Sequence, residues 1–481
     1  MMSSSNDDVI TVRRGCIILL DIPPGTAITL DGVTRITPTT SSSLGSMVII
    51  DNIPSSTTDT DFHLLIVKKS NTLHNNGGGH ALPVGFILVP TTTVDDDGYY
   101  DWTFVRKYDI YNEEISNVDK PMDEISMNNL LLALRNGELY HCTIQYDQFM
   151  KNNATASTTS YDSNGGLSSP NDDAIGHQYG NNSNGNQCLP SWDVRTYMIN
   201  SNFLHVCHDI EHGCKIVPSS NIGSRGSTYG STTTDTANDD DATNNTVVKD
   251  GKSITYPAIP CIDTTITNNI RLVTRHTGTR LYLSTLSPKE RTRLLFVNSS
   301  VDDDDDRKET EENNNNAERS QPVGENVFED VLRRYDNSNN NGRGDISCSK
   351  GEEYFLADIE LSFLLFIHLE CHVSLEHWRD SISMCALATI TAAAAVRSST
   401  KPTTTSIVYR RSSFFHSLLS ILYQQLLCIE VDFFREVEYS AGEENFLVVA
   451  LQRLYSACAT AQQQSDSVDT AAAASKRKRG E

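Results

Sequence analysis

The sequence predicts an α+β protein: an N-terminal β-rich domain that is sandwich- or barrel-like, a C-terminal α-helical domain, and long disordered inserts. Three observations lead to this fold class. Short apolar runs of strand length, separated by Gly and Pro, fill the first part of the chain. Apolar residues at helical spacing fill the last part. Tracts of Asn, Ser, Thr, Asp and Gly interrupt both, and such tracts bury too little apolar surface to offset the entropy of ordering them.

The N-terminal strands are expected within residues 9–150. Residues 16–20 are a continuous apolar run, which is followed by Pro23, Pro24 and Gly25, residues that favour a turn. A second turn is expected at residues 31–32, where Asp precedes Gly. Further strand-length runs are found at residues 47–50, 62–67, 85–89 and 99–108, and one helix is expected at residues 128–134.

The middle of the chain is expected to hold one helix and one strand. Apolar residues in 192–217 follow the helical period loosely, which favours a bridging helix. Residues 279–286 read as a strand because Leu281 and Leu283 alternate with polar neighbours.

The C-terminal part is expected to be a bundle of amphipathic helices. Residues 356–367 follow the i, i+3, i+4, i+7 rule, and similar patterns recur at 328–335, 375–385, 414–425 and 446–454. Helices that each carry an apolar face must pack on one another. We therefore expect one shared core, with five candidate members: Phe363, Phe366, Trp378, Leu422 and Phe446.

These patterns set the expected domain boundaries along the chain. They are a β-rich domain at 9–150, a disordered insert at 151–191, a bridging helix at 192–217, a second disordered insert at 218–264, a linker strand at 265–298, a third disordered insert at 299–325, a helical domain at 326–462, and a tail with a basic cluster at 463–481.

Composition excludes some classes of function. Lys plus Arg total 39 and Asp plus Glu total 62, so the formal charge is −23, which disfavours strong direct binding of nucleic acid. A basic protein partner is easier to reconcile with this charge. The 11 cysteines form no CxxC pair, which favours a reducing compartment. No apolar run approaches the ~18 residues that a membrane span needs, and the polar, acidic N-terminus is not a signal peptide, so no membrane association is expected.

Several segments, taken in order, resemble one known family. The most specific are an apolar helix at 356–366 that leads into Glu376-His377-Trp378, a helix at 419–426, and the start of a final helix at 445–447. The earlier segments at 15–26, 197–204 and 278–284 agree. Together they resemble the AAR-two family. The departures are the Asn/Ser/Asp-rich inserts and Tyr197, where the family more often has Trp.

The resemblance implies a non-enzymatic role without a cofactor. Members of the AAR-two family assemble the spliceosomal U5 particle for mRNA splicing. They bind its large scaffold protein, pre-mRNA-processing factor eight, through the RNase-H-like and MPN-type domains of that protein. They hold the precursor particle before the unwinding helicase joins. A location in nucleus and cytoplasm is expected.

One alternative is a zinc-dependent peptidase. His208, Glu211 and His212 fit an H-x-x-E-H pattern, in which two His residues four apart on a helix share a face and hold Zn²⁺ while Glu acts as base. Cys207 and Cys214 are nearby potential ligands. The favoured interpretation is a polar helix face with incidental histidines, because no third-ligand motif follows. We therefore assign no catalytic, cofactor-binding or metal-binding residues.

A second alternative is an unrelated acidic scaffold that binds partners through its disordered tracts. The candidate nuclear localisation signal is independent of this choice. It consists of four consecutive basic residues in the tail: Lys476, Arg477, Lys478 and Arg479.

Overall fold

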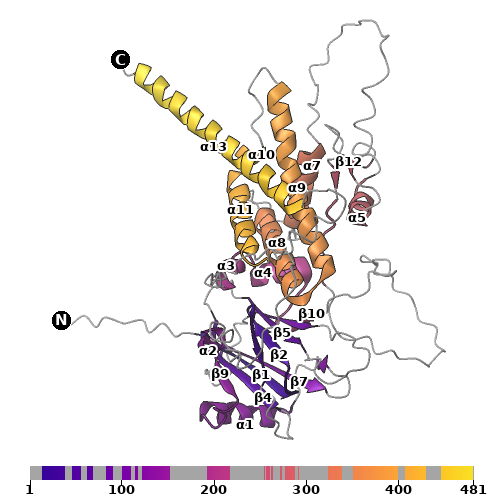
Figure 1. Cartoon of the computed structure of the whole chain (residues 1–481), viewed down its shortest axis with the longest axis vertical. Helices are drawn as coiled ribbons and strands as arrows, with labels where there is room; N and C mark the ends of the chain where they lie inside the picture. The colour runs from indigo at the N-terminus through magenta and orange to yellow at the C-terminus, as the bar shows by residue number, and fades with distance from the viewer. Residues whose placement is uncertain are drawn as a thin grey trace, which may run out of the picture. The chain divides into compact units, whose positions relative to one another are not determined.

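The structure is a computed structural model, which describes residues 13–37, 46–55, 62–68, 83–89, 100–109, 114–116, 122–151, 192–216, 254, 256–260, 262–263, 271–272, 277–287, 291, 323–337, 350–398, 407–429 and 446–479. The described parts confirm the α+β class, with strands first and helices last (Figure 1). The chain divides into two compact units. Unit 1 comprises Met1–Thr57, His63–Ala81 and Pro90–Trp192, and unit 2 comprises Thr58–Phe62, Leu82–Val89 and Asp193–Glu481.

Unit 1 is built around strand β1 (Arg13–Ile22). This strand pairs antiparallel with β4 (Ser46–Ser55) and parallel with β7 (Trp102–Asp109). Strands β8 (Glu114–Ile115) and β9 (Thr143–Gln145) complete the order β8-β7-β1-β4-β9. Residues 16–19 of β1 are all fully buried, and burial on both faces explains why the run is continuously apolar rather than alternating.

Helix α1 (Glu124–Arg135) packs on one face of this sheet. Leu134 on α1 clusters with Cys16 and Ile18 of β1, and Leu130 packs against the same cluster. The helix begins earlier than the expected residues 128–134 because Asp123 caps it, accepting a 2.8 Å hydrogen bond from the Ser126 backbone N–H.

A second group of strands in unit 1 comprises β2 (Ala27–Leu30), β3 (Val33–Ile36) and β5 (His63–Lys68), all paired antiparallel. The turn expected after β2 is confirmed. Asp31 and Gly32 have φ values of 54° and 81°, as a two-residue type I′ hairpin requires. A short helix, α2 (Tyr146–Lys151), follows β9.

Unit 2 contains two short strand pairs. Strand β6 (Val84–Leu88) pairs antiparallel with β10 (Cys214–Ile216), although they lie far apart in the chain. Strand β11 (Ile262–Asp263) pairs with β12 (Arg271–Leu272). The first pair brings residues from the N-terminal third of the sequence into the unit that holds the C-terminal helices.

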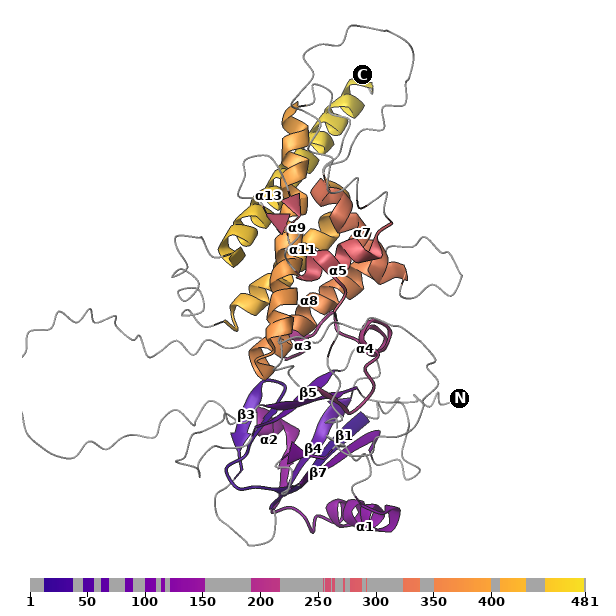
Figure 2. The same cartoon turned by 90° about the vertical axis from the view of Figure 1, so that its right-hand side faces the viewer.

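The helices of unit 2 pack around α8 and α9 (Figure 2). Their bounds are α4 (Ser201–His208), α5 (Thr277–Thr285), α7 (Val323–Asn337), α8 (Lys350–Leu369), α9 (His372–Ser398), α10 (Ile407–Arg410), α11 (Ser412–Leu426) and α13 (Phe446–Arg479); α3 (Trp192–Arg195) starts at the boundary of the two units. Helix α8 packs against α4, α7, α9 and α11. No helix within the described ranges is long and apolar enough to cross a membrane.

Trp378 on α9 lies at the centre of the candidate core residues. Its ring centroid is 5.3 Å from that of Phe363, 6.4 Å from that of Phe366 and 5.8 Å from that of Phe446. Its indole N–H donates a 2.9 Å hydrogen bond to Gln425 Oε1 on α11, one turn after the buried Leu422. Side chains from α8, α9, α11 and α13 thus meet around one tryptophan.

The expected strand at 279–286 is wrong. Residues Thr277–Thr285 form helix α5, whose buried residues are Thr279, Tyr282 and Leu283. That spacing is i, i+3, i+4, the helical one. The prediction failed because it counted Leu281, which is only partly buried, and treated Tyr282 as a polar neighbour.

The single bridging helix at 192–217 is also wrong. The segment forms α3, a turn, α4 and then strand β10. Asn200 starts α4 by accepting a 2.8 Å hydrogen bond from the Phe203 N–H. Asp209 ends it in the left-handed conformation, with a φ of 52°. These local caps interrupt what periodicity alone presents as one helix.

The expected inserts fall mainly outside the described residues: 152–191, 217–253 and 292–322 lie there entirely. The exceptions lie at the edges of the expected inserts. Lys151 ends α2 and residues 323–325 begin α7, so the first and third inserts are shorter than expected. At the end of the second insert, residues 254, 256–260 and 262–263 are described, and they include the buried Ile259 and strand β11. The boundary expected at 462 is not a break in the helix, since α13 continues to Arg479.

Candidate functional site: the buried Asp358 cluster

The most deeply buried acidic side chains among the described residues of unit 2 are Asp358 and Glu360. Asp358 and Glu360 on α8 are 0% and 2% exposed, and they stand among apolar residues on a helix that is buried on nearly every side. Carboxylates are almost never fully buried unless they are paired. Their partners therefore determine what this part of the molecule does.

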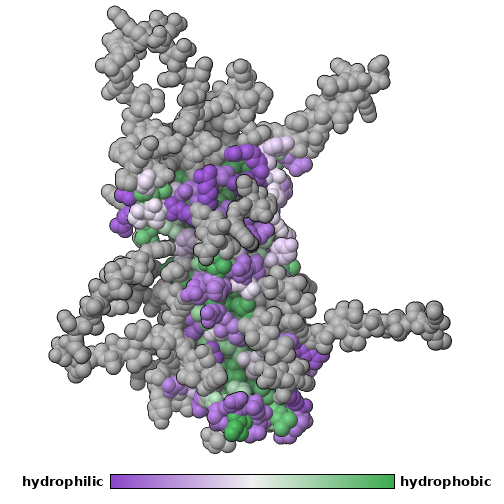
Figure 3. All heavy atoms as spheres, turned by 180° about the vertical axis from the view of Figure 1, so that it is seen from behind, coloured by the Kyte–Doolittle hydropathy of each residue, from purple (hydrophilic) through white to green (hydrophobic). Residues whose placement is uncertain are grey.

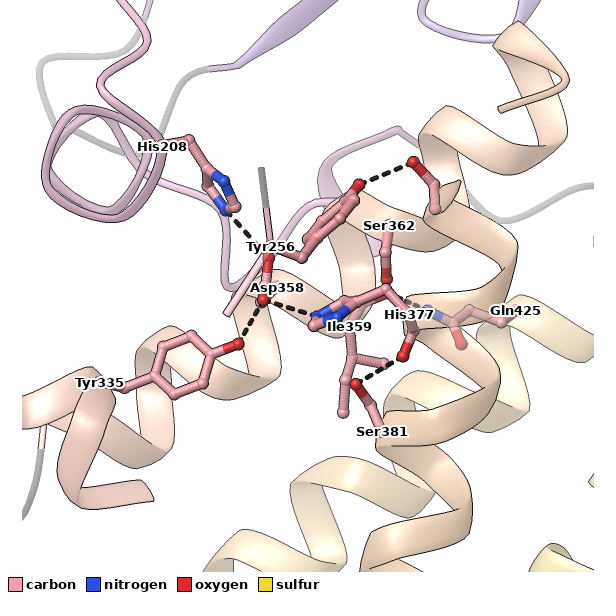
Figure 4. Close-up of polar contacts among 10 residues, drawn as sticks. His208, Tyr256, Tyr335, Asp358, Ile359, Ser362, His377, Ser381 and Gln425 are labelled. Carbon is pink, nitrogen blue, oxygen red and sulfur yellow. Dashed lines mark hydrogen bonds and ion pairs between the residues drawn. The ribbon is translucent and has the colours of Figure 1, made fainter. Parts of the chain in front are cut away.

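Asp358 accepts hydrogen bonds from three different helices (Figure 4). His208 Nε2 on α4 donates to Oδ1 at 2.9 Å, and His377 Nε2 on α9 donates to Oδ2 at 2.8 Å. The hydroxyl of Tyr335 on α7 also donates to Oδ2. We call these four residues the Asp358 cluster; they connect α4, α7 and α9 to α8.

The electrostatics of the cluster favour an ionised carboxylate. Burial by itself raises the pKa of Asp358, but the charges and hydrogen bonds of His377 and His208 outweigh it, so the pKa lies well below the usual aspartate value. Burial, followed by the Asp358 charge, raises the pKa of Tyr335. Tyr335 therefore keeps its proton and serves as a donor.

Glu360 is held differently. Its Oε2 accepts a 2.9 Å hydrogen bond from the Met198 backbone N–H in the turn between α3 and α4. Burial raises its pKa, and the backbone N–H groups of Met198 and Ile199 lower it only in part. Asn202 on α4 also hydrogen-bonds the Tyr354 hydroxyl on α8. The α4 segment is thus fixed to α8 at several points along its length.

Residues 256–260 lie over the histidines of the cluster. The Tyr256 ring stacks on the His377 ring, with centroids 4.2 Å apart and planes at 14°, and meets the His208 ring edge-on at 5.6 Å. Its hydroxyl is 2.8 Å from Ser374 Oγ on the first turn of α9. Ile259 is 3% exposed. This segment lies inside a stretch that composition marked as disordered.

A carboxylate beside two imidazoles is chemistry that hydrolytic sites use. Here both imidazoles direct Nε2 at the carboxylate, and His208 and His377 are only 5% and 6% exposed. A substrate in solvent has little access to them. The geometry instead supports a structural role: the hydrogen bonds to Asp358 join α4, α7 and α9 to α8.

The zinc-site alternative does not match the geometry. His208 is the last residue of α4, so His208 and His212 do not share a helix face. His208 turns to Asp358, whereas His212 Nδ1 lies 2.5 Å from the Val89 carbonyl oxygen. Burial, followed by the Asp358 charge, raises the pKa of Cys207 to about 12, which disfavours a thiolate ligand. Within the described ranges no three His, Cys, Asp or Glu side chains are placed to hold a metal ion.

The candidate localisation residues Lys476, Arg477, Lys478 and Arg479 form the end of helix α13. Their backbone is helical in this structure.

Sequence reasoning did not identify Asp358, Tyr335 or Tyr256 as a group. A signal existed for Asp358, since it stands between Ala357 and Ile359 in an otherwise apolar helix. No periodicity connects it to His208, which is distant in sequence. Tyr256 has no comparable local signal.

Comparison with known proteins supplies the family. No curated protein matches the chain. The model of the AAR2 C-terminal repeat region matches residues 305–478, a span that includes α7 to α13 and three members of the Asp358 cluster: Tyr335, Asp358 and His377. This family consists of non-catalytic assembly factors of the U5 particle in mRNA splicing. The resemblance drawn from the sequence is therefore confirmed for this span, since residues 305–478 match the AAR2, or AAR-two, family model.

Proposed function

We propose that this chain binds the large U5 scaffold protein, pre-mRNA-processing factor eight, and holds the precursor particle before the helicase joins. The observation that carries the proposal is the family match over residues 305–478. The net charge of −23 adds support, because it favours a basic protein surface as partner over nucleic acid.

Candidate contact residues are found among the exposed aromatic side chains. Polar and apolar side chains are interspersed in the coloured part of the face in Figure 3. Exposed tyrosines stand out in unit 2: Tyr197 is 74% exposed, Tyr423 60% and Tyr455 70%. Tyrosine is enriched among residues that dominate binding energy. We propose these three as contacts of the scaffold protein.

The two units suggest bivalent binding, which we call a clamp: each unit binds a different domain of the same partner. Once one unit is bound, the other meets its own domain at an effective concentration of about a millimolar, which raises the overall affinity without any new contact. The expected partner domains are the RNase-H-like and MPN-type domains. We propose a location in nucleus and cytoplasm, with Lys476–Arg479 as the import signal.

Binding of purified components tests the proposal. The full chain is titrated with the RNase-H-like domain, with the MPN-type domain, and with a protein that contains both. The two-domain protein should bind at least about tenfold more tightly than either domain. No measurable binding to any of the three would refute the proposal, and equal affinity for all three would refute the clamp.

A variant pair tests the surface. Tyr455→Ala removes an exposed aromatic residue from α13 and should weaken binding about tenfold, as is typical of an interface anchor. Gln452→Ala on the exposed face of the same helix is the control and should bind like the unaltered chain. Equal affinities for both variants would exclude Tyr455 as a contact.

A further inference from the structure

Residues 256–260 resemble a bound peptide in their sequence and in the way they lie on the helices. Their sequence is Tyr-Pro-Ala-Ile-Pro, and no helix or strand is assigned to them. Pro257 and Pro260 fix φ and lack an N–H, and the residue before each proline is biased to extended backbone. Such segments lose little conformational freedom when they bind, which is why Pro-rich peptides dock on aromatic surfaces.

The surface under this segment belongs to regular structure. His377 and Ser374 are on α9, and His208 is on α4. Both imidazole rings are oriented by hydrogen bonds to Asp358, so the ring on which Tyr256 stacks is held in place before Tyr256 arrives. Ser374 is fully buried and has its Oγ at the Tyr256 hydroxyl. The receptor side is therefore preorganised, an arrangement that lowers the free-energy cost of binding.

The contacts of Tyr256 include one ring stack, one edge contact and the hydroxyl contact with Ser374. Strand β11, which follows, lies against α9. We propose that residues 256–260 are a displaceable strap over a peptide-binding surface formed by His208, Ser374 and His377. The surface accepts an extended partner segment in which an aromatic residue precedes proline, and the strap competes with it. This inference does not depend on the identity of the U5 scaffold protein.

A fluorescent peptide with the sequence of residues 253–260, SITYPAIP, tests the proposal by anisotropy on the full chain. An attached strap has an effective concentration of about a millimolar, so for a peptide Kd of about 0.1 mM it occupies the surface about nine-tenths of the time. The Tyr256→Ala chain should therefore bind the peptide about tenfold more tightly than the unaltered chain. A peptide with Ala in place of its tyrosine should bind neither.

Two further variants keep the proposal falsifiable. Tyr256→Phe retains the ring stack and loses the hydroxyl contact, so it should bind the peptide two- to fivefold more tightly than the unaltered chain; it replaces Tyr256→Ala if that chain fails to fold by circular dichroism. Adding Ser374→Ala to either variant should weaken peptide binding two- to tenfold. Equal peptide affinity for the unaltered and Tyr256 variant chains, or no binding to a folded variant, would overturn the proposal.

Discussion

Replacing Asp358 with Asn isolates the role of the buried charge. The amide keeps one acceptor oxygen but presents an NH₂ group to donors, while His208, His377 and Tyr335 all donate to this position. At least one donor is left without an acceptor, which costs about 1–3 kcal/mol, and removing one partner of a buried ion pair costs about 3–5 kcal/mol. We expect Asp358→Asn to destabilise α8 by about 3–5 kcal/mol.

Glu360→Gln is the matched control, two residues away on the same helix. The pKa of Glu360 is raised in the folded state, so the unfolded chain releases this proton at a lower pH than the folded chain does. Its ionisation therefore lowers the free energy of unfolding as pH rises above the unfolded value of about 4.3. Glutamine keeps the acceptor for the Met198 N–H without that cost. The Glu360→Gln chain should be at least as stable as the unaltered chain at pH 7.

Hydrogen–deuterium exchange of the α8 amides measures the stability of this helix in both variants. It reports the free energy of opening of α8 separately from the stability of unit 1. The pKa of Asp358 is lowered on folding, so its contribution is present above the unfolded value of about 3.9 and is lost as pH falls through the folded pKa. The effect of Asp358→Asn should shrink below about pH 4. A destabilisation under about 1 kcal/mol at pH 7, or the same value for both variants, would show that the Asp358 carboxylate does not stabilise α8.

Three further predictions concern other parts of the chain. Gly15→Ala should destabilise unit 1 by about 1–3 kcal/mol, because an added Cβ would lie 2.0 Å from Trp102 Cε2. The urea dependence of Trp fluorescence measures this change, and an unchanged unfolding midpoint would contradict the prediction. Gln425→Leu should cost about 1–3 kcal/mol in α9 exchange, since it removes the acceptor of the buried Trp378 N–H, whereas Gln424→Leu, at a half-buried neighbouring position, should cost less. Replacing Lys476, Arg477, Lys478 and Arg479 with Ala should reduce nuclear accumulation of a fluorescent fusion; unchanged accumulation would exclude the cluster as the import signal.

The helices of unit 2 could be predicted from the sequence wherever a helix has one buried face. In α11, Phe414, Leu418, Ile421 and Leu422 are buried at the spacing that the sequence presents. Helix α8 is buried on nearly all sides, so its periodicity could not show that Asp358 and Glu360 also point into the protein. A polar residue in an apolar helix is ambiguous until its partners are known, and those partners lie on other helices.

The connecting segments were the least predictable. In α5 the buried Tyr282 carries a hydroxyl, which donates a 3.1 Å hydrogen bond to Asp330 on α7, and this concealed the helical spacing. In residues 192–216, the caps at Asn200 and Asp209 divide what looked like one helix. Tyr256 makes tertiary contacts with His377, His208 and Ser374, all distant in sequence. Local sequence carries no information about such contacts.

Affinity purification of the tagged full chain from cells, followed by mass spectrometry, tests whether the chain binds the U5 scaffold protein in the cell. We expect the large U5 scaffold protein to be strongly enriched together with other U5 proteins, and the unwinding helicase to be absent from the same particles. Recovery of the chain without the scaffold protein, or with a complete U5 particle that already contains the helicase, would rule out the proposed role.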